Sequence, residues 1–323
     1  MKKYSFKIII GITSILLLFL MPGNGLAQDQ ANADGEVRIG AMKGPTGMGL
    51  VQLMDMDQYE FTLSGTSDEI VAGIVGGNLD VAAVPCNLAS VLFNRTQGQV
   101  SVAAVNTLGV LYVLETGSTI NTIEDLKEKT VYTTGKGTTP EFVLRYVLME
   151  NGIDPDTDLN IEFKSEATEI ATMFATGQEM IALLPQPFVT TVSAQNPDAR
   201  IALDMTAEWN KVSPESQLIT GCVIVRNDFV EEDEKALDLL FDNYANSVDF
   251  VNENPDEASV LIEEYAIIPS AAIAKKAIPY SNITLIQGDE MQQLVNDYLS
   301  VLFSANPESV GGMLPDESFY YKK

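Results

Sequence analysis

Residues 37–46, VRIGAMKGPT, lead from a short apolar strand through a glycine-containing turn to the start of a helix. The same order recurs before residue 100, with strands expected at 60–63 and 80–84. Thr46 can cap the first helix, and Thr66 can begin a capping box for the second. Such an alternation of short apolar strands and amphipathic helices favours an α/β fold with mainly parallel strands.

A second series of strands and helices follows the polar segment 116–122. Its expected strands are 130–134, 159–163, 180–184 and 201–203, and its expected helices include 140–149 and 188–194. The apolar run 218–225 is expected to return the chain to the first unit, where late helices would buttress it without extending a sheet: 232–251, 255–265, 270–278 and 289–303. We therefore assign 34–110 and 224–323 to lobe 1 and 111–223 to lobe 2.

The N-terminus has the pattern of a secretory signal peptide. Lys2, Lys3 and Lys7 precede an apolar run at 8–20, which is short for a membrane span and is followed by small residues. We expect residues 1–33 to be a cleaved signal peptide and leader, with an uncleaved anchor as the alternative. No cysteine follows the run, which disfavours a lipid anchor, so the mature chain is expected to be secreted into the periplasm or the extracellular space.

Composition argues against several classes of function. The 19 basic and 45 acidic residues give a formal net charge of −26, which repels nucleic acid and anionic membranes. The chain contains no histidine, so Ser-His-Asp triads, Cys-His pairs and histidine metal sites are excluded. The two cysteines, Cys86 and Cys222, are either a disulfide pair or two buried small residues.

Several loop motifs, in their order along the chain, carry a resemblance to a known family. They are GAMKGPT at 40–46, IVGGNLDVA at 74–82, TIEDLK at 122–127, GKGTTP at 135–140, ATGQ at 175–178 and LPQP at 184–187. Over nearly the whole mature chain the sequence resembles the periplasmic binding proteins of ABC importers. The nearest branch includes nitrate, taurine, alkanesulfonate and thiamine-pyrimidine-precursor binding proteins, and no motif singles out one of these ligands.

The resemblance implies a two-lobed periplasmic-binding-protein fold of type II, with a cleft between the lobes that closes by hinge motion. The chain would cross between the lobes near 106–114 and again near 219–225. We expect a monomer that needs no cofactor, captures a small-molecule ligand and delivers it to the permease subunits of an ABC importer.

Loops at the carboxyl ends of parallel strands line the ligand crevice of α/β folds, and helix N-termini there present free backbone N–H groups. Four loops qualify, and the ligand contacts expected from them are Lys43, Gly44, Pro45, Thr46, Pro85, Cys86, Asn87, Gly137, Thr138, Thr139, Gln186, Pro187 and Phe188. Gly44 permits close approach of the backbone, Asn87 can donate and accept, and Pro140 favours a helix start that accepts an anion.

These residues also have purely structural interpretations. Thr46, Thr138 and Asn87 can be helix caps, and Lys43 and Lys136 can be solvated charges at the rim. Trp209, the only tryptophan, can stack on a planar ligand or cover the core.

Alternatives to a transport function stay open at this stage. A ligand-sensing subunit of a membrane receptor would share the fold, and a small-metabolite enzyme can be built on the same scaffold. We expect no catalytic residues, because acid-base chemistry without histidine would depend on carboxylates, lysines or Cys86. We expect no metal site, since the four loops hold no carboxylate cluster with ligand spacing.

Overall fold

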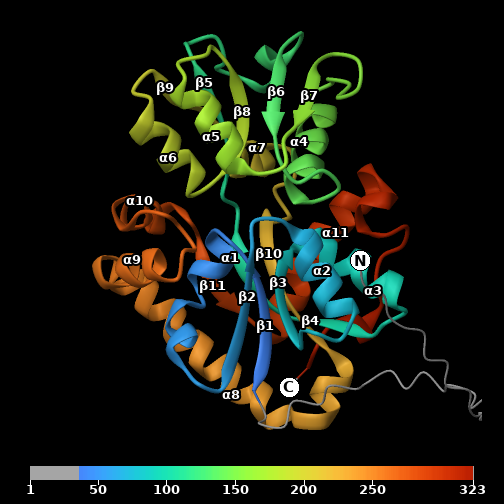
Figure 1. Ribbon diagram of the computed structural model, residues 1–323. Helices are drawn as coiled ribbons and strands as arrows, with labels where there is room; N and C mark the ends of the chain where they lie inside the picture. Colours follow the sequence, from blue (N-terminus) through green and yellow to red (C-terminus); the bar gives the residue numbers. More distant parts are fainter. Residues whose placement is uncertain (1–35, 323) are drawn as a thin grey trace, which may run out of the picture. The chain divides into compact units, whose positions relative to one another are not determined.

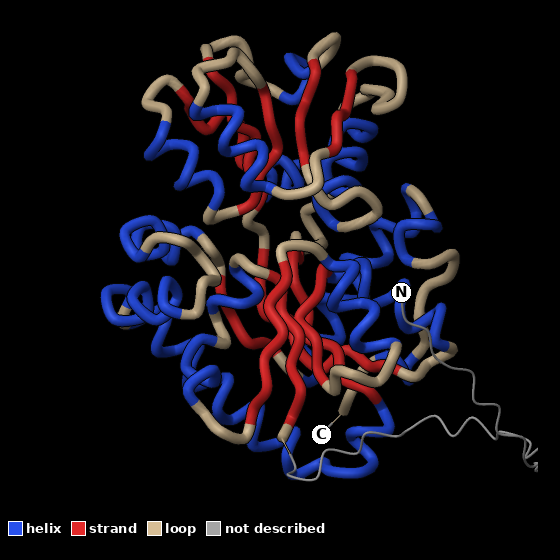
Figure 2. Tube along the Cα trace, in the orientation of Figure 1, coloured by secondary structure: helices blue, strands red, loops and turns tan. Residues whose placement is uncertain are grey.

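Two mixed sheets with helices on both faces carry the fold (Figures 1 and 2). The computed structural model describes residues 36–322, so the predicted signal peptide and leader at 1–33 lie outside the described residues. Among residues 36–322, no helix combines the length and the apolar character that crossing a membrane requires.

The first sheet has the strand order β11-β4-β10-β3-β1-β2. In chain order its strands are β1 (Val37–Met42), β2 (Tyr59–Ser64), β3 (Val81–Pro85), β4 (Val100–Leu108), β10 (Ile219–Arg226) and β11 (Ile283–Ile286). The segments that accompany it are α1 (Pro45–Met48), η1 (Val51–Asp55), α2 (Ser67–Val75), α3 (Cys86–Thr96), α8 (Asn227–Glu253), α9 (Pro255–Glu264), α10 (Ala271–Ala277), η3 (Ile278–Tyr280), α11 (Gly288–Ala305), η4 (Pro307–Val310) and η5 (Glu317–Phe319). We call these elements the first lobe.

The second sheet has the strand order β7-β6-β8-β5-β9. Its strands are β5 (Leu111–Thr116), β6 (Thr130–Thr133), β7 (Asn160–Phe163), β8 (Ile181–Pro185) and β9 (Ala199–Asp204). Its helical segments are η2 (Ile123–Leu126), α4 (Thr139–Glu150), α5 (Ala167–Ala175), α6 (Phe188–Gln195) and α7 (Met205–Val212). We call these elements the second lobe.

The expectation of mainly parallel strands holds for only part of each sheet, because five of the nine neighbouring strand pairs within residues 36–322 are antiparallel. In the first lobe β1 is parallel to β2 and β3, and in the second lobe β6 is parallel to β7 and β8. The strands beside the crossings differ, because β10 runs antiparallel to β3 and β4, and β5 runs antiparallel to β8 and β9. Each sheet is therefore mixed, with its parallel part next to the helix starts.

The first crossing between the sheets lies within the expected 106–114, whereas the return crossing lies before Ile219 and not at the expected 219–225. Strand β4 ends at Leu108 and β5 begins at Leu111 in the other sheet. On the return, the whole of β10 from Ile219 pairs with β3 and β4. Residues 219–223 were assigned to lobe 2, and the predicted boundary at 223/224 falls inside this strand. Its ladder with two first-lobe strands places these residues in the first sheet.

Two elements were missed by the sequence interpretation. Strand β11 lies in a region expected to be helical, and it extends the first sheet by pairing antiparallel with β4. Helix α7 begins at Asp204, whose side chain accepts hydrogen bonds from the N–H groups of Thr206 and Ala207. Helix α7 contributes to the junction between the lobes described below.

Alternating side chains divide the first sheet into two apolar faces. On β3, Ala82 and Val84 belong to the core under α2, α3 and α11, whereas Val81 and Ala83 belong to the core under α8 and α9. This is the period-two pattern of a strand covered on both sides. Figure 1 shows the two groups of helices on opposite sides of the sheet. The helices thereby hold the strand ends, and the loops that follow them, in fixed positions.

An aromatic cluster connects α11 of the first lobe to the second lobe. The ring centroid of Trp209 on α7 lies 5.0 Å from that of Tyr146 on α4 and 5.5 Å from that of Tyr298 on α11. Trp209 and Tyr298 are both fully buried. The C-terminal helix therefore packs against both lobes.

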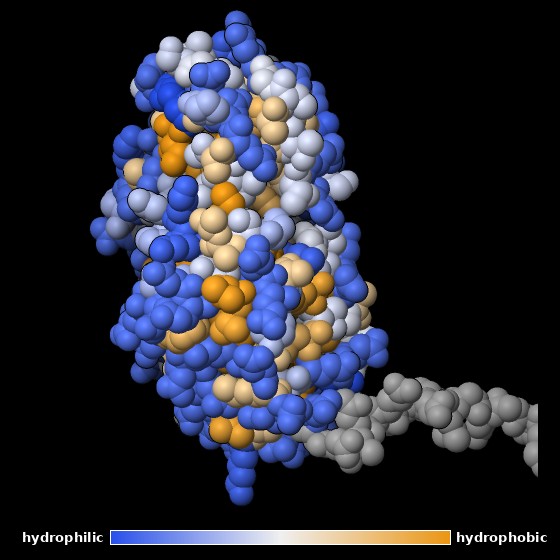
Figure 3. Space-filling view, turned by 60° about the vertical axis from the view of Figure 1, so that its left-hand side comes forward, coloured by the Kyte–Doolittle hydropathy of each residue, from blue (hydrophilic) through white to orange (hydrophobic). Residues whose placement is uncertain are grey.

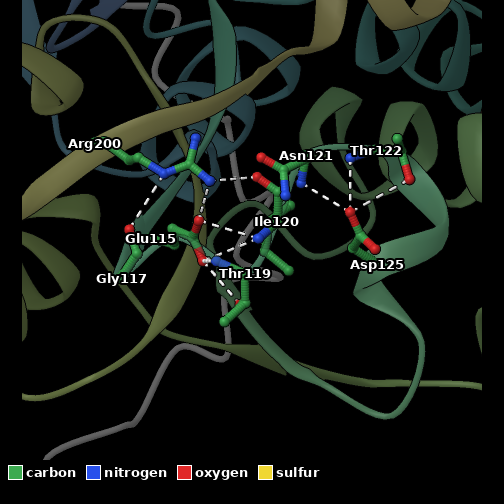
Figure 4. Close-up of polar contacts among 8 residues, drawn as sticks. All are labelled: Glu115, Gly117, Thr119, Ile120, Asn121, Thr122, Asp125 and Arg200. Atoms are coloured by element: carbon green, nitrogen blue, oxygen red, sulfur yellow. Dashed lines mark hydrogen bonds and ion pairs between the residues drawn. The ribbon is translucent and has the colours of Figure 1, made fainter.

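A buried carboxylate, paired with a partly exposed arginine, fixes the far end of the second sheet (Figure 4). The carboxylate of Glu115 accepts hydrogen bonds from the N–H groups of Thr119 and Ile120 and forms an ion pair with Arg200. Burial alone would raise the pKa of Glu115, but these hydrogen bonds and the charge of Arg200 outweigh it, so the pKa is lowered. The ionised carboxylate is thus a structural component of the turn between β5 and η2.

The surface carries small, separate apolar groups. Figure 3 shows a face on which hydrophilic side chains predominate and hydrophobic ones gather in small groups. The exposed large apolar side chains come from many elements, including Val75 on α2, Leu239 on α8 and Val260 on α9. Scattered apolar residues of this kind are normal on protein surfaces.

Candidate functional site

A cavity of about 720 Å³ is lined by residues of both lobes. Its walls include the loops after β1, β2 and β3 in the first lobe and after β6, β7 and β8 in the second. These are the carboxyl ends of the parallel strands, which is where α/β sheets present ligand-binding loops. The cavity therefore occupies the position expected for the cleft.

The first-lobe wall has three parts. The helix-start loops contribute Lys43, Thr46, the segment Gly65–Asp68 and Pro85. The segment between α9 and α10 adds Ala266, Ile267, Ile268 and Pro269, and the strands β4 and β10 add Thr107 and Thr220. This wall is thus polar where helices begin and apolar where the α9–α10 segment covers it.

The second-lobe wall is built mainly from three loops, at the starts of α4, α5 and α6. They contribute the segments 134–136 and 138–140, 164–168, and the residues Pro185, Pro187 and Phe188. Val110 and Leu111, where the chain crosses between the sheets, also line the cavity. Each of the three helices directs its N-terminus toward this space, where unpaired N–H groups and the helix dipole favour negative charge.

The rims of the two lobes touch at specific atoms. Asn87 Nδ2 on α3 donates to the carbonyl oxygen of Gly137 at 3.3 Å, and Thr139 Oγ1 donates to Asn87 Oδ1 at 3.2 Å. A Cβ atom placed on Gly65 would lie 3.2 Å from Glu166 Oε1 of the second lobe. The loops from the two lobes therefore meet around the cavity, as in a closed arrangement.

The structure brings most of the predicted site residues onto the cavity. Those that line it are Lys43, Pro45, Thr46, Pro85, Thr138, Thr139, Pro187 and Phe188. The others lie beside it and are Gly44, Cys86, Asn87, Gly137 and Gln186. Gly44, with φ 122°, turns the chain between β1 and α1 in a conformation that favours glycine.

The polar residues beside the cavity already have partners within the protein. Asn87 is fully buried and also donates to the carbonyl oxygen of Ser309 at 2.9 Å. The Gly137 N–H donates to Glu141 Oε2 at 2.7 Å, and Gln186 Oε1 accepts from the N–H and the hydroxyl of Thr190. These contacts give the three residues a positioning role.

Two threonines on the cavity also use their hydroxyls locally. Thr138 Oγ1 donates to the carbonyl oxygen of Gly135 at 2.6 Å, and Thr46 Oγ1 donates to that of Met42 at 3.1 Å. The prediction that Thr46 caps the first helix is wrong, because Gly44 is the N-cap of α1 and Thr46 lies within the helix. Thr138 is the N-cap of α4, but its side chain accepts no capping hydrogen bond. Their hydroxyls therefore shape the loops after β6 and β1.

The sequence interpretation missed several parts of the lining. These are the loop after β2, the loop after β7, the α9–α10 segment and the threonines of β4 and β10. The first two could have been found by applying the same rule to the strands at 60–63 and 159–163, since each is followed by polar residues and a helix. The α9–α10 segment had no comparable motif.

Three lysines and two carboxylates give the cavity lining a small excess of positive charge, in contrast to the acidic chain as a whole. Lys43, Lys136 and Lys164 line it, together with the acidic Asp68 and Glu166. Lys164 lies 3.9 Å from Glu169 and 5.5 Å from the ring of Tyr132, while Lys136 lies 5.7 Å from the ring of Phe163. The lining thus carries more cations than carboxylates in a chain of net charge −26.

Trp209 and the two cysteines belong to the core. Trp209 does not line the cavity, and its indole N–H donates to the carbonyl oxygen of Ser216 at 3.2 Å. Cys86 and Cys222 are buried free thiols. Burial and the adjacent Cys86 raise the pKa of Cys222 well above its ordinary value, so its thiol stays protonated. Within residues 36–322, no group of three or more acidic or cysteine side chains could hold a metal ion.

Comparison with solved structures establishes the fold. A similar structure, an ABC transporter protein from Parabacteroides distasonis, is 22% identical with a TM-score of 0.73, over 90% of this chain and 100% of that one. The periplasmic aliphatic sulphonate binding protein SsuA from Escherichia coli is 15% identical with a TM-score of 0.71, over 89% and 92% of the two chains. The periplasmic nitrate-binding protein NrtA from Synechocystis is 12% identical with a TM-score of 0.61, over 85% and 84%. The expected two-lobed α/β fold is confirmed.

Sequence comparison gives the family. No curated protein matches the chain by sequence. The sequence model of the family described as "ABC transporter, phosphonate, periplasmic substrate-binding protein" matches residues 52–267, which include both crossings and most of the cavity. The predicted resemblance to importer binding proteins is thereby confirmed, and the chain belongs to this family of periplasmic substrate-binding proteins of ABC transporters.

Proposed function

We propose that the chain binds a small organic anion in the cavity between its lobes and delivers it to the permease subunits of an ABC importer. The observation that carries this proposal is the placement of Lys43, Lys136 and Lys164 on the cavity of a strongly acidic protein. A few local donors can bind an anion inside a negative envelope, because desolvated interactions at short range outweigh screened charges far away.

The helix starts support the same charge preference. The cavity includes the first residues of α2, α4, α5 and α6. Helix N-termini are favourable positions for phosphate, sulfonate and carboxylate groups, since N–H groups and the helix dipole act together there. The description of the matching family names phosphonate. Two structural neighbours are described as binding proteins for aliphatic sulphonate and for nitrate. An oxyanion group on the ligand fits both observations.

Size and apolar lining favour an organic ligand over a small inorganic ion. The cavity of about 720 Å³ lies within the range of pockets that bind small organic molecules. Leu111, Phe188 and Ile267 supply apolar surface that an inorganic anion would leave without a partner. We therefore infer a ligand with an anionic group and a hydrocarbon or aromatic body.

The delivery role also carries expectations for location and assembly. The chain is expected to act outside the cytoplasmic membrane as a monomer whose lobes close on the ligand. Size-exclusion chromatography with light scattering measures the mass, and a stable dimer at micromolar concentration would contradict the monomer.

Calorimetry with defined probes tests the proposal. The probes are propane-1-sulfonate, propylphosphonate and sodium nitrate, and we expect the two organic anions to bind and nitrate to bind at least tenfold more weakly. Lys43→Gln combined with Lys136→Gln should weaken binding of the organic anions and reduce its dependence on salt. The matched control is Lys235→Gln, because Lys235 is exposed on α8 and does not line the cavity. Equal effects of the double variant and the control would refute the basic site.

A further inference from the structure

Two hydroxyl groups lie on the strands where the chain passes between the lobes. Thr107 is the second-to-last residue of β4, and Thr220 is the second residue of β10. The strands are antiparallel neighbours, with Gly221 opposite Thr107, and both threonines line the cavity. These two hydroxyls therefore come from the strands that form the wall of the cleft, and not from the loops at the helix starts.

Neither hydroxyl has a partner among the described residues. The Oγ1 atoms of Thr107 and Thr220 are buried without a hydrogen bond, and Thr107 is 0% exposed. A buried hydroxyl with no partner costs roughly 1–3 kcal/mol, so such groups are uncommon unless something else satisfies them. The hydroxyls of Thr46 and Thr138 on the same cavity each donate to a backbone carbonyl oxygen. Thr107 and Thr220 differ from them in having no such acceptor within residues 36–322.

The backbone beside the pair is packed so closely that it has no room for a side chain at 221. A Cβ atom on Gly221 would lie 2.5 Å from Asn106 Oδ1, 2.7 Å from Thr46 Cγ2 and 3.2 Å from Thr107 Cβ. Asn106 Oδ1 is itself buried and unpaired, while its Nδ2 donates to Tyr244 Oη at 3.0 Å. Glycine at 221 thus avoids a clash that would displace Thr107 and with it the polar recess that Thr107 and Thr220 form on the cavity wall.

We propose that Thr107 and Thr220 form a second polar subsite, which hydrogen-bonds an uncharged polar group at the end of the ligand opposite its anionic group. This inference rests on the proposed function for the anionic end. Lys43 and Lys136 are exposed and lie at the mouth, whereas Thr107 is fully buried, so the two subsites are at different depths.

The chemistry of the recess selects the class of this second group. Hydroxyls both donate and accept, so they suit a hydroxyl, carbonyl or amide group on the ligand. A charged group there would lose its hydration without gaining a counter-ion, because the acidic residues of the lining, Asp68 and Glu166, come from the helix-start loops after β2 and β7. The favoured ligand class is therefore an organic oxyanion that also carries a neutral polar group.

A matched pair of probes tests the subsite by calorimetry. We expect 3-hydroxypropane-1-sulfonate to bind about tenfold more tightly than propane-1-sulfonate, as one to two added hydrogen bonds of about 1 kcal/mol each would give. Thr107→Val and Thr220→Val should each reduce this preference, while Thr107→Ser should keep it. Thr96→Val is the control and should keep the preference, because Thr96 lies on α3 outside the cavity lining and donates to the carbonyl oxygen of Leu92 at 2.8 Å.

Thermal unfolding of the ligand-free protein supplies an independent readout. Thr107→Val removes an unpaired hydroxyl, so its Tm should equal or exceed that of the wild type, whereas loss of a structural hydrogen bond would lower it. Equal affinity of wild-type protein for the two probes, or an unchanged preference in both valine variants, overturns the subsite and leaves anion binding intact. Failure of both probes to bind overturns the proposed function together with it.

Discussion

Asn87 on α3 joins the two lobes through Gly137, whose carbonyl oxygen lies 3.3 Å from Asn87 Nδ2. The same amide accepts from Thr139 and donates to the carbonyl oxygen of Ser309. One buried side chain thus connects the loop before α4 to two segments of the first lobe. Asn87 does not line the cavity. Its effect on the closed arrangement of the lobes comes from holding the loop before α4 against the first lobe.

Asn87→Ala should lower the free energy of unfolding by roughly 1–3 kcal/mol, because buried groups on both lobes lose their partner. It should also increase the radius of gyration of the ligand-free protein in small-angle scattering. Asn94→Ala is the control, since Asn94 Nδ2 donates to the carbonyl oxygens of Val310 and Met313 within the first lobe. Identical scattering curves for the two variants would exclude an inter-lobe role.

Thr138→Val should weaken binding of propane-1-sulfonate. The hydroxyl of Thr138 holds the turn at Gly135 with a 2.6 Å hydrogen bond, so its loss should loosen the loop that carries Lys136 and cost about 1 kcal/mol of stability. Thr138→Ser keeps the hydroxyl and should bind like the wild type. Calorimetry and urea unfolding measure the two effects, and unchanged affinity in the valine variant would remove this turn from the site.

Glu115→Gln should reduce the acid sensitivity of the fold. The folded-state pKa of Glu115 is lowered, so its contribution to stability is present above the ordinary carboxyl pKa of about 4.3 and is lost as pH falls through the folded value. The unfolding free energy of the variant should therefore change less between pH 6 and pH 3 than that of the wild type. Glu150→Gln, on the exposed end of α4, should retain the wild-type slope. If the unfolding free energies of both variants depended on pH in the same way, the stabilising role of ionised Glu115 would be contradicted.

Trp209→Ala should lower the free energy of unfolding by about 3–5 kcal/mol, because it removes a fully buried aromatic ring. Tyr280→Ala is the control, since Tyr280 is 59% exposed and its loss should change stability by less than about 0.5 kcal/mol. Trp209→Phe keeps much of the packing and should bind propane-1-sulfonate with wild-type affinity. A large loss of affinity in Trp209→Phe would indicate that Trp209 stacks on the ligand and does not serve only as a core residue.

The strand-helix order could be predicted because each step has a local cause. Val37–Met42 is an apolar strand followed by a turn with Gly44 and Pro45, and the same combination recurs around Gly135 and Pro140. Loops at the carboxyl ends of such strands are placed together by the sheet itself. The cavity position of Lys43, Thr46, Thr138 and Phe188 follows from that rule without any knowledge of the ligand.

Other features depend on contacts between distant segments and leave no local pattern. Ile283–Ile286 forms a strand only because β4 offers an open edge, and a four-residue segment with three apolar side chains between helices does not indicate this partner. The burial of Asn87 depends on Ser309 and Gly137, which are far away in sequence. Thr107 and Thr220 were missed because an unsatisfied hydroxyl is visible only when all its neighbours are known.

The packing of Tyr298 against Trp209 also connects the second lobe to a late part of the chain. Pro269 is the last residue that lines the cavity, whereas Tyr298 lies further along the chain, on α11 (Gly288–Ala305). A chain cut before α11 would therefore keep every residue of the cavity wall and lose the helix that packs on Trp209. The walls of the cavity and this support for the second lobe are thus encoded in separate stretches of the sequence.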